Sequence, residues 1–132
     1  MVIEEALYAF LAATAGVTAL VSTRIYPQVI PQDAVLPAIA YQRISGPRVH
    51  SQSGASGLAY PRFQFTCQAA TYSAARQVAN AVRAALDGYR GTMGGAGGVS
   101  VGAAFVANEI DGYSEESGEH TVRLDVVIYH AE

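Results

Sequence analysis

Apolar side chains near the N-terminus follow a helical spacing. Glu4 and Glu5 fall in the first turn of this segment, where the helix dipole favours acidic side chains. Gly16 ends the helix, and residues 17–21 have the pattern of one further short helical turn. The apolar positions that carry this prediction are Ile3, Leu7, Phe10 and Leu11.

A second helix is predicted between a cap at Thr71 or Ser73 and a stop at Gly88. Arg76 and Arg83 lie about two turns apart in this segment, so they share one exposed flank. The opposite flank is an apolar stripe that consists of Ala75, Val78, Ala79, Val82 and Leu86.

Alternation of apolar and polar residues marks strands over residues 38–44, 60–69, 99–106 and 121–130. The clearest alternation is in residues 60–69, where Phe63, Phe65 and Cys67 line one face and polar residues line the other. Such strands are half-buried and are typical of an antiparallel sheet. The last strand turns an apolar face inward that consists of Val122, Leu124, Val126 and Ile128.

The order of these elements is helix, strand, strand, helix, strand, strand. It predicts an α+β domain in which two helices pack on one face of an antiparallel sheet of about four strands. The chain has 132 residues, with no internal repeat and no composition shift that would mark a boundary. We therefore expect one domain over residues 1–132.

The segments that join the predicted helices and strands differ in composition. Pro27, Pro31 and Pro37 predict an extended surface crossing. Residues 45–58, SGPRVHSQSGASGL, form the longest stretch without either pattern, and loops longer than about 12 residues are usually functional or disordered. Residues 108–119 are predicted to form an acidic turn.

The charges are few and unevenly distributed. Charged residues make up 14% of the chain, which indicates either surface that is hidden against partners or simple dilution by Ala and Gly. Residues 1–108 hold seven arginines against four acids, whereas residues 109–132 hold Arg123 against seven acids. A basic body and an acidic end favour head-to-tail pairing between copies, which is what a ring requires.

The residues that carry catalytic or metal chemistry elsewhere do not form a recognisable pattern here. The Gly-rich segment 91–98 follows a helix and precedes a strand, the reverse of a phosphate-binding loop, and a connector or hairpin arm is the better interpretation. His50, His120 and His130 lack ligand spacing and are expected to be exposed or at an interface. Cys67 is expected in the core. We predict no enzyme, no cofactor and no metal.

Two further interpretations concern location and nucleic acid. The N-terminus has acids where a signal peptide has positive charge, and the single cysteine has no intrachain partner, so we expect assembly in a reducing cytoplasm. A net charge of −3 without a basic run argues against tight binding of DNA phosphates. A channel through which DNA slides without sticking is compatible with this charge.

Four stretches of the sequence resemble the phage tail-completion, or tail-terminator, family, which also has members in gene transfer agents. Their order and spacing carry the resemblance, since none is a catalytic motif. They are EALYAFL with VTALVSTRIYP, then LPAIAYQRISG, then LAYPRFQFTCQAATYSAAR, and last VRAALDGYRG.

The resemblance implies a structural virion protein of the tail or neck that works as a ring, expected to be a hexamer. The ring would cap the tail tube, end tube polymerisation, dock the head connector and leave a lumen for DNA. Its partners would be further copies of itself, the tail tube protein, the connector protein and passing DNA, with no membrane. A head-side connector or adaptor is the alternative, and a small ligand-binding or enzymatic domain is a distant one.

The candidate contact residues lie in the loop, on the second helix and in the acidic turn. We expect the loop over residues 45–58 to order on a neighbour or on the tube, although a merely mobile surface loop would have the same composition. The candidate residues are Arg48, Val49, His50, Arg76, Arg83, Glu115, Glu116 and Glu119.

Overall fold

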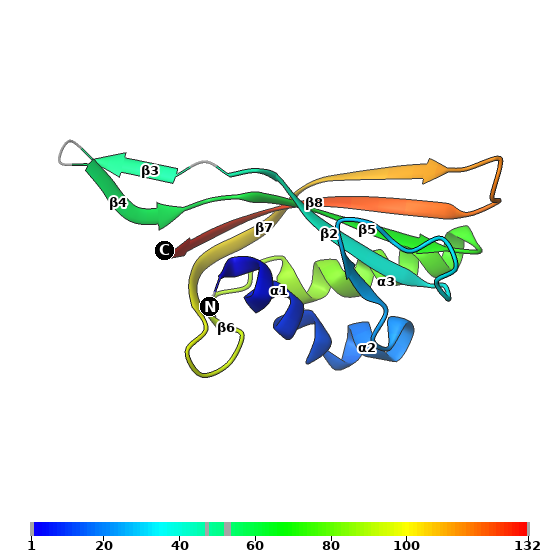
Figure 1. The fold of residues 1–132 in the computed structure, drawn as a ribbon, viewed down its shortest axis with the longest axis horizontal. Coiled ribbons are helices and arrows are strands. Elements are labelled where there is room, and N and C mark those ends of the chain that lie inside the picture. The colour runs from blue at the N-terminus through cyan, green and yellow to red at the C-terminus, as the bar shows by residue number, and fades with distance from the viewer. Residues whose placement is uncertain (1, 47, 52–53, 132) are drawn as a thin grey trace.

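The computed structural model describes residues 2–46, 48–51 and 54–131, with the backbone alone for 48–51 and 54–56. Within these residues the chain forms three helices and one mixed sheet of eight strands (Figure 1). The helices are α1 (Ile3–Ala12), α2 (Ala15–Val21) and α3 (Tyr72–Leu86). The strands are β1 (Ile25–Pro27), β2 (Ala38–Ser45), β3 (Arg48–Ser51), β4 (Gly54–Ala59), β5 (Arg62–Ala69), β6 (Gly91–Met93), β7 (Val99–Tyr113) and β8 (His120–Ala131).

The predicted helices form where the apolar spacing places them. The hydroxyl of Thr71 accepts a hydrogen bond of 3.2 Å from the backbone N–H of Ala74, which caps α3. The whole predicted apolar stripe of α3 is buried. Helix α1 ends at Ala12 and not at Gly16, and the predicted short turn is a separate helix, α2, which begins at Ala15 and contains Gly16. The count of two helices was therefore wrong, because α1 and α2 are distinct rods bent by 78°.

The sheet is larger than the four antiparallel strands that were predicted. Strand β8 pairs antiparallel with both β5 and β7, and β2 pairs antiparallel with β5. The short strand β1 runs parallel to β2 and makes the sheet mixed. It has only three residues, too few for alternation to mark it in the sequence.

The predicted loop over residues 45–58 was also wrong in its described part, because most of it is a hairpin. Strand β3 continues the line of β2, and β4 leads into β5. Arg48 pairs with Ala59 just beyond the pair of Ser45 with Arg62. Strands β3 and β4 therefore continue the antiparallel pairing of β2 with β5. The Ser and Gly composition conceals this pairing because it lacks apolar alternation.

The acidic turn is shorter than predicted. Strand β7 continues through Tyr113, and the turn occupies residues 114–119. The register of β7 against β8 shifts between Val106 and Asn108, so the alternation read from the sequence ends there although the strand does not. A bulge of this kind leaves no signature in the local pattern.

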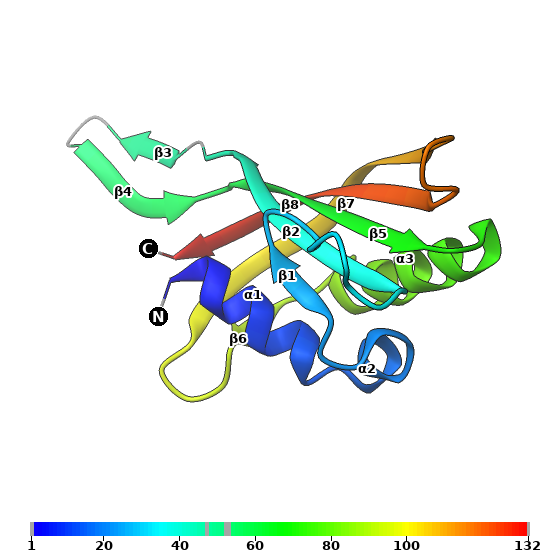
Figure 2. The same ribbon diagram turned by 45° about the vertical axis from the view of Figure 1, so that its right-hand side comes forward.

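The three described helices cover one face of the sheet, and no helix of the described residues lies on the other face (Figures 1 and 2). The core lies between the helices and that covered face. Cys67 is fully buried there, as predicted, and burial raises the pKa of its thiol to about 12. The largest fully buried side chains include Leu7, Leu11, Ile39, Phe63, Phe65, Leu86, Leu124 and Ile128.

Two details complete the fold. The Gly-rich segment contains β6 and a turn, and a side chain at Gly98 would overlap the carbonyl oxygen of Met93. Among the described residues no single helix has the length and apolarity of a membrane span, and α1 and α2 reach them only as a bent pair.

Candidate assembly interface

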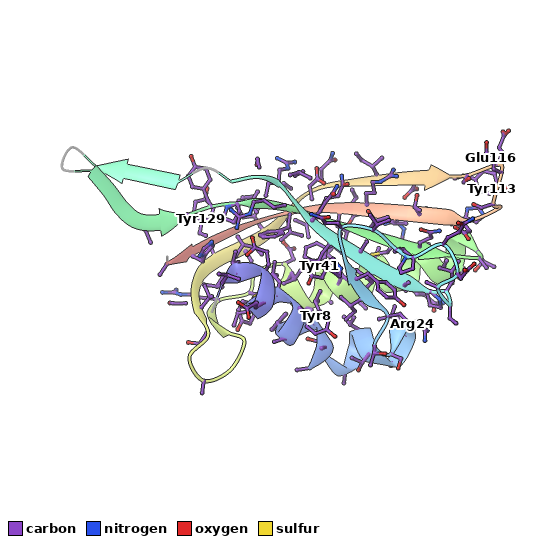
Figure 3. All side chains as sticks on the ribbon, in the orientation of Figure 1. Tyr8, Arg24, Tyr41, Tyr113, Glu116 and Tyr129 are labelled. Carbon is purple, nitrogen blue, oxygen red and sulfur yellow. The ribbon has the colours of Figure 1, made fainter. Side chains whose placement is uncertain are left out.

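The described molecule has two protruding ends on its long axis. The β3–β4 hairpin projects at one end and the β7–β8 turn at the other (Figure 1). Figure 3 shows Tyr113 and Glu116 at the second of these ends, far from Tyr129. The sheet therefore carries candidate contact residues to opposite sides of the subunit.

The β7–β8 end is acidic. Glu115 and Glu116 are exposed in the turn, whereas Glu119 is half-buried and accepts a hydrogen bond from the side-chain amide of Gln68. The backbone N–H of Ser114 donates to the carbonyl of Glu119 at 3.0 Å, which closes the turn. Of the three predicted carboxylates, Glu115 and Glu116 thus present their charge most fully to a neighbour.

Helix α3 braces this acidic end through Arg76. Its guanidinium lies 3.0 Å from a carboxylate oxygen of Glu109 and 2.6 Å from one of Asp111. The hydroxyl of Tyr72 donates to Asp111 at 2.9 Å. The hydrogen bond with Tyr72, followed by those acids, raises the pKa of Arg76 against the opposing effect of burial. Arg76, predicted as a contact residue, therefore meets acids of its own chain.

Arg83 is held less firmly than Arg76. Its guanidinium lies 3.8 Å from Glu109, and its side chain is 50% exposed, against 28% for Arg76. Arg83 is accordingly the more available of the two for a contact with another protein. Together the pairs neutralise part of the charge separation that the sequence suggested.

The β3–β4 end carries the other predicted contacts. The side chains of Arg48, Val49 and His50 lie outside the described structure, which gives only the backbone of β3. That backbone places the three residues in a hairpin that pairs with β8 only through Leu58 and Ala59.

The face without helices carries a feature that sequence reasoning missed. Tyr60 stacks on Tyr129 with ring centroids 5.3 Å apart, and Phe105 lies 6.2 Å from Tyr129. Exposed Leu58 lies beside them, since it pairs with Ala131. We call Leu58, Tyr60, Phe105 and Tyr129 the aromatic patch. The sequence signal for this patch was that Phe105 and Tyr129 occupy outward positions in strands with an alternating pattern.

Beyond the patch the same face is mainly polar. Arg62 lies 3.2 Å from Asp125, and Gln64 also donates to that carboxylate. Among the described residues no group of three His, Cys, Asp or Glu side chains could hold a metal ion. His130 is buried, contrary to the expectation of an exposed or interfacial side chain, and His120 packs near the rings of Tyr72 and Tyr113.

The family of this chain follows from comparison with known proteins. The sequence model of the family described as "Tail completion protein gp17" matches residues 5–131. The chain belongs to this tail-completion family. The tail-completion protein is a structural protein of a phage tail, as the resemblance had predicted. Membership in this family also indicates a structural role in the virion rather than a catalytic role.

The fold of this tail-completion protein occurs in a solved particle. A chain of the structure titled "Virion of native gene transfer agent (GTA) particle" matches with a TM-score of 0.74 and 19% sequence identity. The match covers 96% of this chain and 92% of the other. At this identity the likeness establishes the shared fold. No curated protein matches the chain.

Proposed function

We propose that this tail-completion protein forms a closed ring, a hexamer, that caps the tail tube. The ring ends tube polymerisation, joins the tail to the head connector and leaves a lumen for DNA. The observation that carries the proposal is the placement of an acidic turn and an Arg- and His-containing hairpin at opposite ends of one sheet. Contacts between unlike ends are heterologous, and such contacts close into rings when the rotation permits.

The separation of the two ends supports contacts between unlike ends over a dimer that joins like ends. A two-fold contact centred on the acidic turn would bring Glu115 and Glu116 against their own copies. Like charges placed together oppose association. The alternative pairing brings these acids toward Arg48 and His50 of the next subunit.

The charge of the chain also supports passage of DNA. Net charge is −3, and Arg62 and Arg76 are both paired with acids of their own chain. Affinity for DNA rises with the number of phosphates that free basic residues neutralise. A ring wall of net negative charge, with arginines partly paired to its own acids, would therefore let DNA move through the lumen without holding it.

Electron microscopy of particles that lack this protein tests the function directly. Overlong or headless tails are expected if it terminates the tube. Full heads without tails, which leak DNA, would instead support a connector or adaptor on the head side. Normal-length tails in the deletion strain, with only monomer in light scattering of the purified protein, would refute the terminator role.

A further inference from the structure

A groove lies where β8 ends between two other strands. Ala131 pairs with Leu58 on β4, and His130 pairs with Val101 on β7. The groove has a volume of about 250 Å³ and is lined by Leu58, Ala59, Ser100, Gly102, Tyr129, His130 and Ala131.

The groove has the chemistry of an incomplete site. Leu58 and Tyr129 are exposed on its wall and continue into the aromatic patch. Exposed apolar patches of this kind are uncommon on a finished surface, so the patch indicates a contact that another chain completes.

The opposite end of the subunit has complementary features. Tyr113 is 59% exposed and Ile110 is exposed on the same hairpin, next to the charges of Glu115 and Glu116. The hairpin beside the groove contains Arg48 and His50 in β3. Each end thus joins apolar side chains to charge, and the charges are of opposite sign.

We propose that the β7–β8 turn of a second copy of this chain binds in the groove between β4 and β7. Tyr113 of the incoming turn packs against Leu58 and Tyr129, and its acids face the β3–β4 hairpin. Aromatic side chains in desolvated pockets are the usual energetic centres of such contacts, while the surrounding charges select the partner. This contact rests on the proposed ring, because it supplies the head-to-tail joint.

Cysteine cross-linking tests the contact. The variant L58C/Y113C is purified and treated with a short bismaleimide, alone and on tail tubes. Cross-linked dimers and a ladder of higher oligomers are expected, because each copy offers both ends. The native Cys67 need not be removed, since it is fully buried and its pKa is raised to about 12.

The matched control is V29C/Y113C, in which the first cysteine replaces an exposed residue of the segment between β1 and β2. It is expected to give no ladder. A ladder equally strong in this control, or rings seen by electron microscopy with no ladder from L58C/Y113C, would overturn the contact and leave the ring intact. Absence of rings both in solution and on tubes would overturn the ring itself.

A second measurement does not depend on cross-linking. Y129A is expected to weaken self-association by about 10-fold or more in sedimentation, since one aromatic anchor typically contributes at least that factor. The control is T66A, which shortens a half-buried side chain on β5 of the same face. Circular dichroism of both variants shows that the fold persists. Equal association of Y129A and wild type would contradict the proposal.

Discussion

The two protruding hairpins of this tail-completion protein are built in different ways. The β7–β8 hairpin is long, contains a bulge and is held to helix α3 through Arg76 and Tyr72. Among the described residues, the β3–β4 hairpin pairs with the rest of the sheet at Leu58 and Ala59. The β7–β8 hairpin is thus a braced projection, whereas the β3–β4 hairpin has few described contacts that stabilise it.

This difference suggests a division of roles in assembly. An isolated two-stranded hairpin is marginally stable in water, so β3–β4 would gain stability from a neighbour. A braced projection loses little conformational entropy when it binds, which favours affinity. The acidic end is therefore suited to insert, whereas the β3–β4 hairpin would gain more stability from a contact with a neighbour.

The largest predicted effect comes from a substitution in the core of β8, the strand that pairs with both β7 and β4. Leu124 on β8 is fully buried and pairs with Phe65 on one side and Glu109 on the other. Leu124→Ala is expected to lower the free energy of unfolding by about 3 kcal/mol, through lost burial and the cavity left behind. Urea denaturation measures this value. Thr121→Ala, on the helix-free face, serves as control and should change it by less than about 0.5 kcal/mol.

The second prediction removes the ion pairs that hold the β7–β8 hairpin to α3, so that this hairpin becomes as weakly supported as the β3–β4 hairpin. Arg76→Ala is expected to cost about 1 kcal/mol, because it breaks two ion pairs and leaves Glu109 and Asp111 without their shared cation. Amide exchange should accelerate in residues 109–113 and stay unchanged in β4. Arg83→Ala is the control, with a cost of at most a few tenths of a kcal/mol. Equal effects of both variants would refute the brace.

Charge reversal separates stability from assembly. The double variant E115K/E116K is expected to change unfolding free energy by less than about 0.5 kcal/mol, since both side chains are exposed. Ring formation should weaken in sedimentation, because the acidic end loses its attraction for the basic hairpin. Wild-type rings should also weaken as salt rises from about 0.05 to 0.5 M. Assembly that is insensitive to both changes would exclude this contact.

The smallest effect lies at the root of the β3–β4 hairpin, where Arg43 on β2 lies 2.6 Å from Glu4 on α1. Burial raises the pKa of Glu4, but its backbone hydrogen bond and Arg43 together lower it below the ordinary value of 4.5. The unfolded chain then binds the proton more readily, so this contribution to stability is present at neutral pH and is lost as the pH falls through the lowered pKa. Glu4→Gln should flatten that part of the stability curve between pH 5 and pH 3, as measured by urea denaturation. A slope identical to the wild type would refute it.

Local patterns predicted the parts of this fold that depend on neighbours in sequence. The spacing of Val78, Val82 and Leu86 placed the buried face of α3, and alternation of Phe63 and Phe65 placed that of β5. The family resemblance, confirmed by the match over residues 5–131, came from the order of such segments. Of the candidate contacts, Glu115 and Glu116 lie exposed at one end, whereas the side chains of Arg48, Val49 and His50 are not described.

The sequence by itself therefore determined the buried faces of α1 and α3, the main strands, the buried cysteine and the family. Only the tertiary structure decided that the Ser- and Gly-rich stretch forms a hairpin, that β7 continues past its bulge, and that Arg76 meets Glu109 and Asp111. The reason is physical. Helical and strand periodicities are local, whereas strand partners, bulges and ion pairs between distant residues depend on which segments the core brings together. The groove at the end of β8 belongs to this second kind, since β4, β7 and β8 meet there from distant parts of the chain.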